Sequence, residues 1–368
     1  MMDRYDVLVV GAGPGGLGAA AEAARCGGKV ALLDENTRPG GQLFKQIHKF
    51  FGSREHMAGM RGYKIGEELL TQVQDLGVAV SLNTHVWGIF PGGRVTAVQG
   101  NQSRCYHGAK IVLATGASEN ALSFPGSTLP GVMTAGAAQT LMNLYHVLPG
   151  KRVAVVGSGN VGLIVAYQLI QAGAEVAAII EFMPGLSGYQ VHGAKVRRAG
   201  VPIYFNHTVT RAYGGEELAG ITIQRVDEKK QPLPGTEKNL ALDTLCIAAG
   251  LSPRIELSVL SKCRTVYSPA LGGLVPLHTE DMETSNPEIL VAGDLSGVEE
   301  ASTALDEGRL AGLTAAWRLG LNGRERIARE KEAVKNRLAV LRQGPFGAKR
   351  QEAKKKIWEA ARIREKGE

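Results

Sequence analysis

The feature that most constrains this chain is an internal repeat of a glycine-rich turn between a strand and a helix. An apolar strand at 5–10 runs into GAGPGG, an Ala-rich helix and the strand KVALLDE. A strand at 152–156 likewise runs into GSGNVG, an amphipathic helix and EVAAIIE. Each half then continues as a small meander and closes with a buried strand that ends in glycine, at 110–117 and 244–253. Two copies of one α/β nucleotide-binding unit are far more specific than a single GxGxxG motif.

The first glycine turn has the pattern of a dinucleotide site. Gly11, Gly13 and Gly16 fit GxGxxG directly after a strand, and Pro14 lies within the same motif. The first glycine permits the tight turn, the second lets the backbone approach a pyrophosphate, and the third lets the helix pack on the strand. The phosphate then faces unpaired amide N–H groups at the positive end of the helix dipole.

An acidic residue at the end of the second strand completes this pattern. Asp34 follows Gly11 by 23 residues, where a carboxylate can accept ribose hydroxyl groups. Glu35 is a neighbouring candidate, and the sequence leaves the choice between them open. GGQL follows at 40–43, and a GD pair occurs far downstream within ILVAGDLSG at 289–297. These two segments favour FAD over NAD at the first site.

These motifs resemble the flavoproteins with two dinucleotide-binding domains of the thioredoxin-reductase type, over residues 1 to about 321. The resemblance implies that the aspartate of GD binds the ribityl chain of FAD and that GGQ runs alongside the flavin. It also implies that a helix beginning near Ala301 points its positive N-terminus at the isoalloxazine ring. The cofactor-binding residues expected at the first site are Gly11, Gly13, Pro14, Gly16, Asp34, Glu35, Gly41, Gln42, Val86, Thr115, Gly116, Asp294 and Ala301.

The same resemblance gives the expected domain organisation. We expect an α/β protein with two Rossmann-like, three-layer dinucleotide-binding domains, the second inserted in the first, and a charged C-terminal helical tail. The FAD-binding domain would comprise residues 1–118 and 251–322, with the turn at Thr115 and Gly116 leading to the inserted domain. Residues 119–250 would form an NAD(P)-binding-like domain, and residues 323–368 the basic tail.

The segment before the second glycine motif departs from thioredoxin reductases. There those enzymes carry a redox CxxC, whereas residues 131–152 hold no cysteine, which excludes a disulfide reductase. With FPGSTLPG before it, the segment is similar to the α subunits of multi-subunit amine and amino-acid dehydrogenases: opine oxidase, hydrogen cyanide synthase, dye-linked proline dehydrogenase and heterotetrameric sarcosine oxidase. This resemblance implies a partner subunit that oxidises the amine on its own flavin. It also implies a small iron–sulfur protein, since the tail of this chain contains no cysteine that could hold a cluster.

The second glycine turn predicts a second nucleotide site. By residue count Ile180 takes the position of Asp34, and Glu181 follows it. An acid there accepts the 2′-hydroxyl of NAD and opposes the 2′-phosphate of NADP, so NAD is favoured over NADP. Members of the resembling group differ in what fills each site, so a vestigial second domain, or an adenine nucleotide alone at the first site, stays open. The cofactor-binding residues expected here are Gly157, Gly159, Asn160, Gly162 and Glu181.

Composition argues against several other classes. The four cysteines lie far apart and the eight histidines are scattered, so neither a dithiol centre nor a metal site has a local pattern. No apolar run approaches the roughly 18 residues that a membrane span requires. The glycine turn at Gly11 leaves room before it for one strand and not for a signal peptide. We therefore expect a cytoplasmic protein without a metal or a membrane span.

The loop after GGQL contains His48 and His56, which are either incidental or close to the flavin. Phe44, Phe50 and Phe51 in the same loop belong either to the core or to an interface. No residue stands out as a general acid or base, so the catalytic residues stay unassigned.

The tail holds most of the positive charge. Residues 322–368 contain 15 Lys and Arg against 7 Asp and Glu, while the whole chain has a net charge of +7. Val334, Leu338 and Leu341 form a thin apolar stripe that could bury little surface within this chain. The tail is therefore either a solvated helix or a segment that docks on an acidic partner protein. Nucleic-acid binding is disfavoured because acidic residues interleave with the basic ones.

Together the patterns predict an FAD-dependent oxidoreductase that relays electrons between a partner's flavin site and NAD or an iron–sulfur carrier. The flavin supplies the electron chemistry, and the protein supplies positioning and electrostatics. The alternatives are a free-standing NAD(P)H:acceptor flavin reductase and a non-catalytic nucleotide-binding scaffold subunit. The substrate would bind on the partner, so this sequence does not name it.

Overall fold

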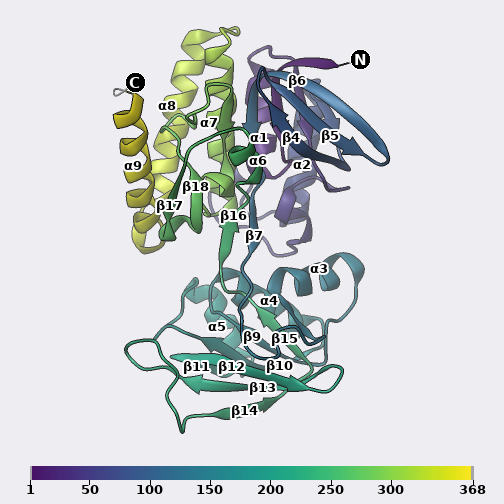
Figure 1. Ribbon diagram of the computed structural model, residues 1–368, viewed down its shortest axis with the longest axis vertical. Coiled ribbons are helices and arrows are strands. Elements are labelled where there is room, and N and C mark those ends of the chain that lie inside the picture. The colour runs from purple at the N-terminus through teal and green to yellow at the C-terminus, as the bar shows by residue number, and fades with distance from the viewer. Residues whose placement is uncertain (1, 366–368) are drawn as a thin grey trace. The chain divides into compact units, whose positions relative to one another are not determined.

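The computed structural model describes residues 2–365, apart from the side chains at 345, 346 and 363–365. The chain divides into two compact units, Met1–Ser118 with Ser252–Glu368, and Glu119–Leu251 (Figure 1). In each unit a strand of a mostly parallel sheet, Asp3–Val10 in the first and Arg152–Val156 in the second, leads into a glycine turn. The predicted α/β class with Rossmann-like sheets and a helical C-terminal region is confirmed.

The sheet of the first unit has the strand order β3-β2-β1-β6-β5-β4, with β19 also paired to β6. The strands are parallel from β3 to β6, and β19 also runs parallel to β6, whereas β4, β5 and β6 form an antiparallel meander. The residues that follow β1, β2 and β19 therefore meet at one edge of the sheet. The bounds are β1 (Asp3–Val10), β2 (Val30–Leu33), β3 (Ala79–Ser81), β4 (Thr84–Phe90), β5 (Arg94–Gln99), β6 (Gln102–Leu113) and β19 (Ile289–Val291).

Two helices of the first unit, α1 and α7, pack unusually closely because glycines line their contact. A Cβ added at Gly308 would overlap the carbonyl oxygen of Gly15, and one at Gly312 that of Ala19. This packing brings the start of α7 beside the start of α1.

The helices of the first unit are α1 (Pro14–Arg25), α2 (Gly62–Asp75), α6 (Glu256–Leu260), α7 (Ala301–Arg318), α8 (Arg324–Leu341) and α9 (Gly344–Glu365). Its short 3-10 turns are η1 (Gly41–Lys45), η2 (Arg54–His56), η3 (Pro269–Leu271) and η4 (Gly293–Ser296). The strands β17 (Thr265–Ser268) and β18 (Gly273–Pro276) form a hairpin.

The second unit has three layers. Its parallel sheet has the order β11-β10-β9-β15-β8. Val153 and Val155 of β9 pack against the helices on one face, whereas Ala154 packs against the meander on the other. This alternation is what period-two side-chain placement requires of a strand buried on both faces. The elements are β8 (Val132–Thr134), α3 (Ala135–Tyr145), β9 (Arg152–Val156), α4 (Asn160–Gln171), β10 (Glu175–Glu181), α5 (Gln190–Arg198), β11 (Ile203–Phe205) and β15 (Thr244–Ile247), and the meander strands β12 (His207–Gly214), β13 (Leu218–Arg225) and β14 (Lys238–Ala241).

Two short strands connect the units. β7 (Ala117–Glu119) leads into the second unit and β16 (Leu251–Pro253) leads out of it, and the two pair with each other. The amide of Asn120 donates to the carbonyl of Gly250 at 3.0 Å, which continues this pairing into the second unit.

The C-terminal helices pack on the first unit. The break between α8 and α9 falls at residues 342–343. Val334 and Leu338 are buried in the core of the first unit, so the expectation that the stripe buries little surface within the chain is wrong. Ile357 of α9 packs with Leu271 in a separate small cluster. The last three residues of the predicted tail lie outside the described part of the chain.

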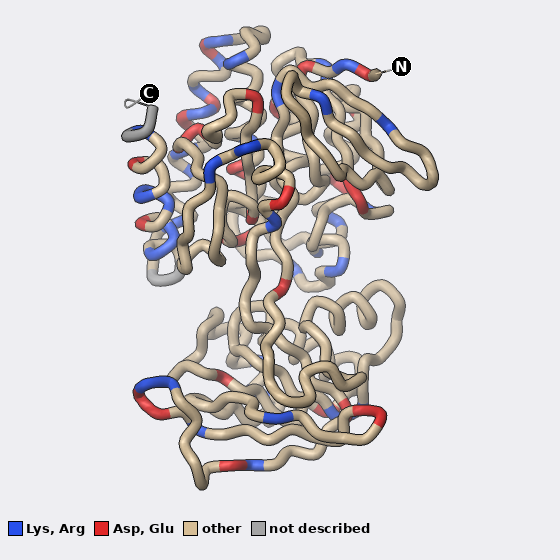
Figure 2. Tube along the Cα trace, in the orientation of Figure 1, with Lys and Arg blue, Asp and Glu red and all other residues tan. Residues whose placement is uncertain are grey.

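Many basic residues of these helices find acidic partners within the chain. Acidic residues are interspersed among the basic ones along α8 and α9 (Figure 2). Lys331 and Lys335 lie 3.0 and 2.8 Å from the carboxylate of Asp281, and Arg337 donates to Asp306 at 3.0 Å. These pairs leave fewer free cations for an acidic partner than the sequence suggests. None of the helices within residues 2–365 is long and apolar enough to cross a bilayer.

Candidate functional site

The candidate site begins at the N-terminus of α1, where the three motif glycines have different surroundings. Gly11 has φ +104°, and a Cβ there would overlap the carbonyl oxygen of Ala114. A Cβ at Gly16 would overlap the carbonyl oxygen of Gly11. At Gly13 the nearest atom would be 4.0 Å away. The first and third glycines are therefore fixed by packing, whereas the second faces open space at a helix start that no side chain caps, with Pro14 as the first helical residue.

Segments far apart in the sequence meet at this turn. The amide of Gly40 donates to the carbonyl of Ala12 at 2.7 Å, and a Cβ on Gly41 would lie 2.9 Å from the Cα of Gly13. Gly293, which precedes Asp294, lies against the first turn of α1, since its added Cβ would be 4.0 Å from the Cα of Gly15. The GGQ and GD segments thus lie beside the glycine turn, and Gln42 follows within η1.

The two acidic candidates after β2 have different environments. Asp34 is 6% exposed and accepts from the amide of Ala12 at 2.5 Å and from the amide and side chain of Asn36 at 2.7 and 2.9 Å. Glu35 is more exposed and pairs with Arg254 at 2.7 Å and His85 at 3.2 Å. Because a carboxylate can accept about four hydrogen bonds, Asp34 retains capacity for one more donor.

The remaining residues expected at the first site lie in the same unit. Val86 is buried in β4, whose first residue, Thr84, donates its amide to the carbonyl of Asp34 at 2.8 Å. The hydroxyl of Thr115 donates to the carbonyl of Arg254 at 2.9 Å, and Gly116 has φ +73° where the chain leaves this unit.

Asp294 lies in the turn η4, directly before the start of α7 at Ala301. Its Oδ1 accepts from the amide of Glu299 at 3.2 Å. Burial raises the pKa of Asp294 to about 7, and the neighbouring carboxylates of Glu307 and Glu299 add to this. The carboxyl group is therefore poised between its neutral and ionised forms at neutral pH.

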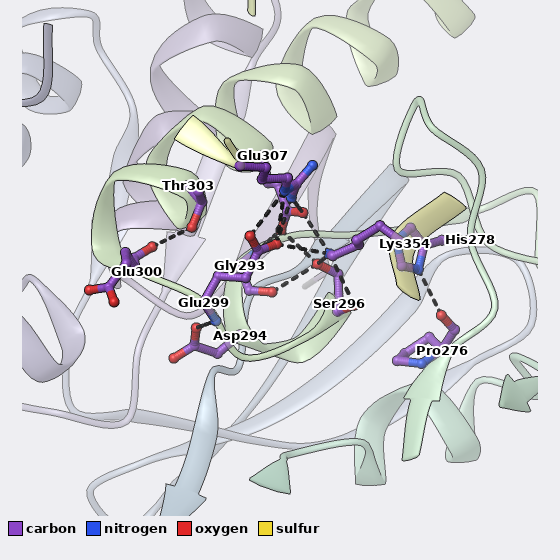
Figure 3. Close-up of polar contacts among 11 residues, drawn as sticks. Pro276, His278, Gly293, Asp294, Ser296, Glu299, Glu300, Thr303, Glu307 and Lys354 are labelled. Atoms are coloured by element: carbon purple, nitrogen blue, oxygen red, sulfur yellow. Dashed lines mark hydrogen bonds and ion pairs between the residues drawn. The ribbon is translucent and has the colours of Figure 1, made fainter. Parts of the chain in front are cut away.

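A buried ion cluster lies behind this turn (Figure 3). Glu307 of α7 accepts from the amide of Gly293 at 3.1 Å and from the hydroxyl of Ser296 at 2.6 Å. Lys354 of α9 donates to Glu307 at 2.6 Å and to the hydroxyl of Ser296 at 2.7 Å. Burial alone would raise the pKa of Glu307, but the charges of Lys354 and Arg342 hold it below its usual range. The cluster is thus ionised, and its cations come from the C-terminal end of the chain.

His278 lies beside this cluster. It is buried, and its Nδ1 donates to the carbonyl of Pro276 at 2.8 Å. Burial, together with the charge of Lys354, lowers the pKa of His278 to about 3, so the imidazole is neutral.

The loop after GGQL is anchored rather than free. Nε2 of His56 donates to Oδ2 of Asp306 at 3.0 Å, and the side chains of both residues are almost completely buried. His56 therefore fastens the loop to α7. Phe50 packs against the core, whereas Phe51 is 62% exposed.

The second glycine turn repeats the geometry of the first. Cβ atoms at Gly157 and Gly162 would overlap the carbonyl oxygens of Ala248 and Gly157, and a Cβ at Gly159 would meet nothing within 4 Å. Asn160 begins α4, and its side-chain oxygen accepts from the amide of Tyr189 at 2.8 Å.

The expected equivalence of Ile180 and Asp34 is wrong. The amide of Gly157 donates to the carbonyl of Ile180, as that of Gly11 does to Leu33. Ile180 therefore corresponds to Leu33, and Glu181 to Asp34. The register shift between Val176 and Ala178 in β10 absorbs the additional residue.

Glu181 is already fully engaged. It is 4% exposed and accepts from the amide and hydroxyl of Ser158, from the hydroxyl of Ser187 at 3.1 Å and from the amide of Met183 at 2.8 Å. These four bonds use the acceptor capacity of a carboxylate. A ribose hydroxyl would have to displace one of the two serine hydroxyls.

Within the described part of the chain, the cysteines and the potential metal ligands form no centre of their own. All four cysteines are free thiols, and burial raises the pKa of Cys26, Cys246 and Cys263, that of Cys246 to about 12. Among the described residues, no three His, Cys, Asp or Glu side chains are grouped as metal ligands would be.

The first site fits an adenine dinucleotide. Its uncapped helix start and the open face at Gly13 suit a pyrophosphate, and Asp34 and Asp294 are the carboxylates that could accept hydroxyl groups. This arrangement, with the paired units, defines a class of nucleotide-dependent oxidoreductases.

The family model for pyridine nucleotide-disulphide oxidoreductases matches residues 5–308, and the chain belongs to this family of FAD-dependent oxidoreductases. The chain is 32% identical to a subunit of opine oxidase from Agrobacterium tumefaciens (strain Ach5), over 86% of this chain and 66% of that protein. It is 29% identical to the HcnB subunit of hydrogen cyanide synthase from Pseudomonas aeruginosa, over 91% and 74%. It is 28% identical to the alpha subunit of sarcosine oxidase from Corynebacterium sp. (strain P-1), over 89% of this chain but only 34% of that protein.

Two solved structures share the fold. Thioredoxin reductase of T. acidophilum superposes with a TM-score of 0.70 at 22% identity, over 86% of this chain and 98% of that one. L-proline dehydrogenase of P. horikoshii superposes with a TM-score of 0.67 at 23% identity, over 90% and 60%. These comparisons confirm the resemblances inferred from the motifs.

The sequence did not predict the ion cluster behind Asp294. One signal was present, because two adjacent acidic residues, Asp306 and Glu307, occur among the many small and apolar residues of α7, and both are buried. Acidic residues in such a helix require buried partners. The cations that pair with Glu307, Arg342 and Lys354, are 35 and 47 residues away, and no local pattern links them.

Proposed function

We propose that the first unit binds FAD and that the chain is the electron-transferring subunit of a multi-subunit amine or amino-acid dehydrogenase. The observation that supports this most strongly is the meeting of the open α1 N-terminus, the GGQ segment and the Asp294 turn in one place. FAD requires one anion site and one ribityl contact, and these elements offer both.

Each element has a specific role in this proposal. The amides at the start of α1 bind the pyrophosphate, and Asp34 accepts a ribose hydroxyl with its remaining capacity. Glu35, at the exposed rim, lies beside the adenosine, and Asp294 binds the ribityl chain. When bound, FAD accepts and donates electrons, and the N-terminus of α7 at Ala301 stabilises negative charge on the reduced ring.

The partners proposed are a second flavin-containing dehydrogenase subunit and a small iron–sulfur protein. Relatives named as subunits of opine oxidase, sarcosine oxidase and hydrogen cyanide synthase support a multi-subunit assembly. The chain spans 66% of the first of these relatives, so the activity of the complete complex also belongs to the proposal. We place the assembly in the cytoplasm.

The second unit is proposed to take NAD rather than NADP. No Lys or Arg occurs between 182 and 194, and the charge of Glu181 opposes a 2′-phosphate. The full engagement of Glu181 favours the alternative of a vestigial second domain, which keeps the shape of the protein and binds no nucleotide.

The decisive experiment is purification of the chain with and without co-expressed partners. We expect a yellow protein that releases FAD when denatured and that recovers amine-dependent dye reduction only with its dehydrogenase partner. A colourless protein that retains only ATP or ADP contradicts the flavin assignment. Rapid NAD(P)H:dye reduction by the isolated chain would instead identify a free-standing reductase.

A further inference from the structure

The turn that carries Asp294 is held from behind by Glu307. One oxygen of this carboxylate binds the amide of Gly293 and the hydroxyl of Ser296, the first and last residues of η4. Glu307 is 2% exposed, so these bonds are shielded from water. The conformation of the turn therefore depends on the position and charge of Glu307.

The cations that balance Glu307 both come from the C-terminal end of the chain. Lys354 is completely buried, and its ammonium group contacts Glu307 at 2.6 Å and the carbonyl of Ser296 at 3.1 Å. Arg342, which directly follows α8, donates to Glu307 at 2.5 Å and to both oxygens of Glu299. Glu299 in turn donates its amide to Asp294. The last two helices of the fold thus hold both sides of the turn.

This cluster makes the position of α9 and the shape of the turn interdependent. Beyond the lysine, α9 is held by a small apolar cluster that includes Leu271 and Ile357. If α9 separates, Lys354 leaves and Glu307 loses part of its charge compensation in a buried position. A buried carboxylate without its cation is strongly disfavoured, so Glu307 would move and release Gly293 and Ser296.

We propose that α8 and α9 are part of the flavin site. Lys354 and Arg342 are positioning residues that hold the Asp294 turn in its flavin-binding conformation, so that docking of α9 and binding of FAD strengthen each other. The inference rests on the proposed function only in naming FAD as the ligand of the turn. By linkage, FAD stabilises the docked α9 by the same factor by which docked α9 improves FAD affinity.

The test compares Lys354→Met with Lys356→Met. Both residues lie on α9, but Lys356 is exposed and pairs with Glu352 on the same helix. Fluorescence titration of the apoprotein should show the FAD Kd raised by about 5- to 150-fold in Lys354→Met, the range of such couplings. Lys356→Met should leave the Kd unchanged. The visible spectrum of the flavin bound to Lys354→Met should also shift, because the turn beside it has moved.

A double variant separates positioning from simple loss of packing. Lys354→Met combined with Glu307→Gln removes both charges, so no unpaired ion remains and FAD affinity should recover much of the loss. Hydrogen exchange of the apoprotein at residues 293–300 should be faster in Lys354→Met alone. Saturating FAD should slow exchange at residues 347–361 in the wild type.

The outcomes distinguish this inference from the proposed function. The coupling is overturned if folded Lys354→Met binds FAD with the wild-type Kd, or if FAD does not change hydrogen exchange at residues 347–361. Either result leaves the flavin assignment intact. A wild type that binds no FAD refutes the proposed function. Exchange at 293–300 in the apoprotein would then still decide whether Lys354 positions the turn.

Discussion

Replacing single glycines of the first turn by alanine separates folding from cofactor binding. At Gly16 the new Cβ would overlap the carbonyl oxygen of Gly11, which is backbone and cannot rotate away. We expect a loss of about 3 kcal/mol or more in the free energy of unfolding. For a domain of this size that lowers Tm by roughly 6–12 °C.

Gly13→Ala is the matched variant, and it should weaken FAD binding while changing the stability of the fold little. Its backbone, with φ −71° and ψ 179°, suits alanine, and its Cβ would have no neighbour closer than 4.0 Å. The expected stability cost is about 1 kcal/mol, because alanine is a poorer N-cap than glycine. The methyl group would occupy the approach of the pyrophosphate. Losing one amide–phosphate hydrogen bond, worth roughly 1.5–3 kcal/mol, raises the FAD Kd roughly 10- to 100-fold.

Thermal melts of the apoproteins check the expected changes in Tm, and FAD fluorescence titrations check the expected changes in Kd. Two results together would refute the reasoning. One is a Tm of Gly13→Ala as low as that of Gly16→Ala, and the other is a wild-type FAD Kd in the folded protein of either variant. Gly159→Ala, whose Cβ also meets open space, provides a control in the second unit and should leave the FAD Kd unchanged.

Three further outcomes are expected. Burial raises the pKa of Asp294 to about 7, so the wild-type apoprotein should lose stability relative to Asp294→Asn as pH rises from about 4 to about 7. The loss should be at most about 4 kcal/mol. Parallel Tm profiles of the two proteins between pH 4 and 8 would contradict this. Glu181→Arg should lower the Tm of the second unit by several degrees, because it leaves Ser158 without its buried acceptor. It should not change the preferred nucleotide from NADH to NADPH. A stable variant that prefers NADPH in stopped-flow flavin reduction would contradict this. Replacing Cys246, whose thiol has a pKa of about 12, by Ala should leave dye-reduction rates of the folded protein within about twofold, and loss of turnover with flavin content intact would reveal a thiol role.

The local motifs were predictable because their chemistry is local. A strand, a glycine turn and a helix occupy adjacent residues, so GxGxxG located both helix starts and the open faces at Gly13 and Gly159. The start of α7 at Ala301 was expected from the family resemblance that the GD motif carries.

What the sequence could not supply depends on contacts between distant segments. Counting residues from the glycine turn misplaced the acid of the second unit, because the irregular register in β10 is invisible in the spacing. The tail was misjudged because its stripe was considered without the rest of the first unit, where α7 packs against α8 and the core takes in Val334 and Leu338. Lys354 is completely buried although lysine is almost never found so.

The pairing of β7 with β16 has a consequence for how such chains diversify. The middle unit enters and leaves through two adjacent strands, so its own ends lie side by side. Segments inserted in this way can be exchanged, enlarged or lost at little entropic cost to the host fold, because closing the gap requires only a short loop. The architecture therefore allows the ligand specificity of the second unit to evolve independently, while the first unit retains its own core and its own site.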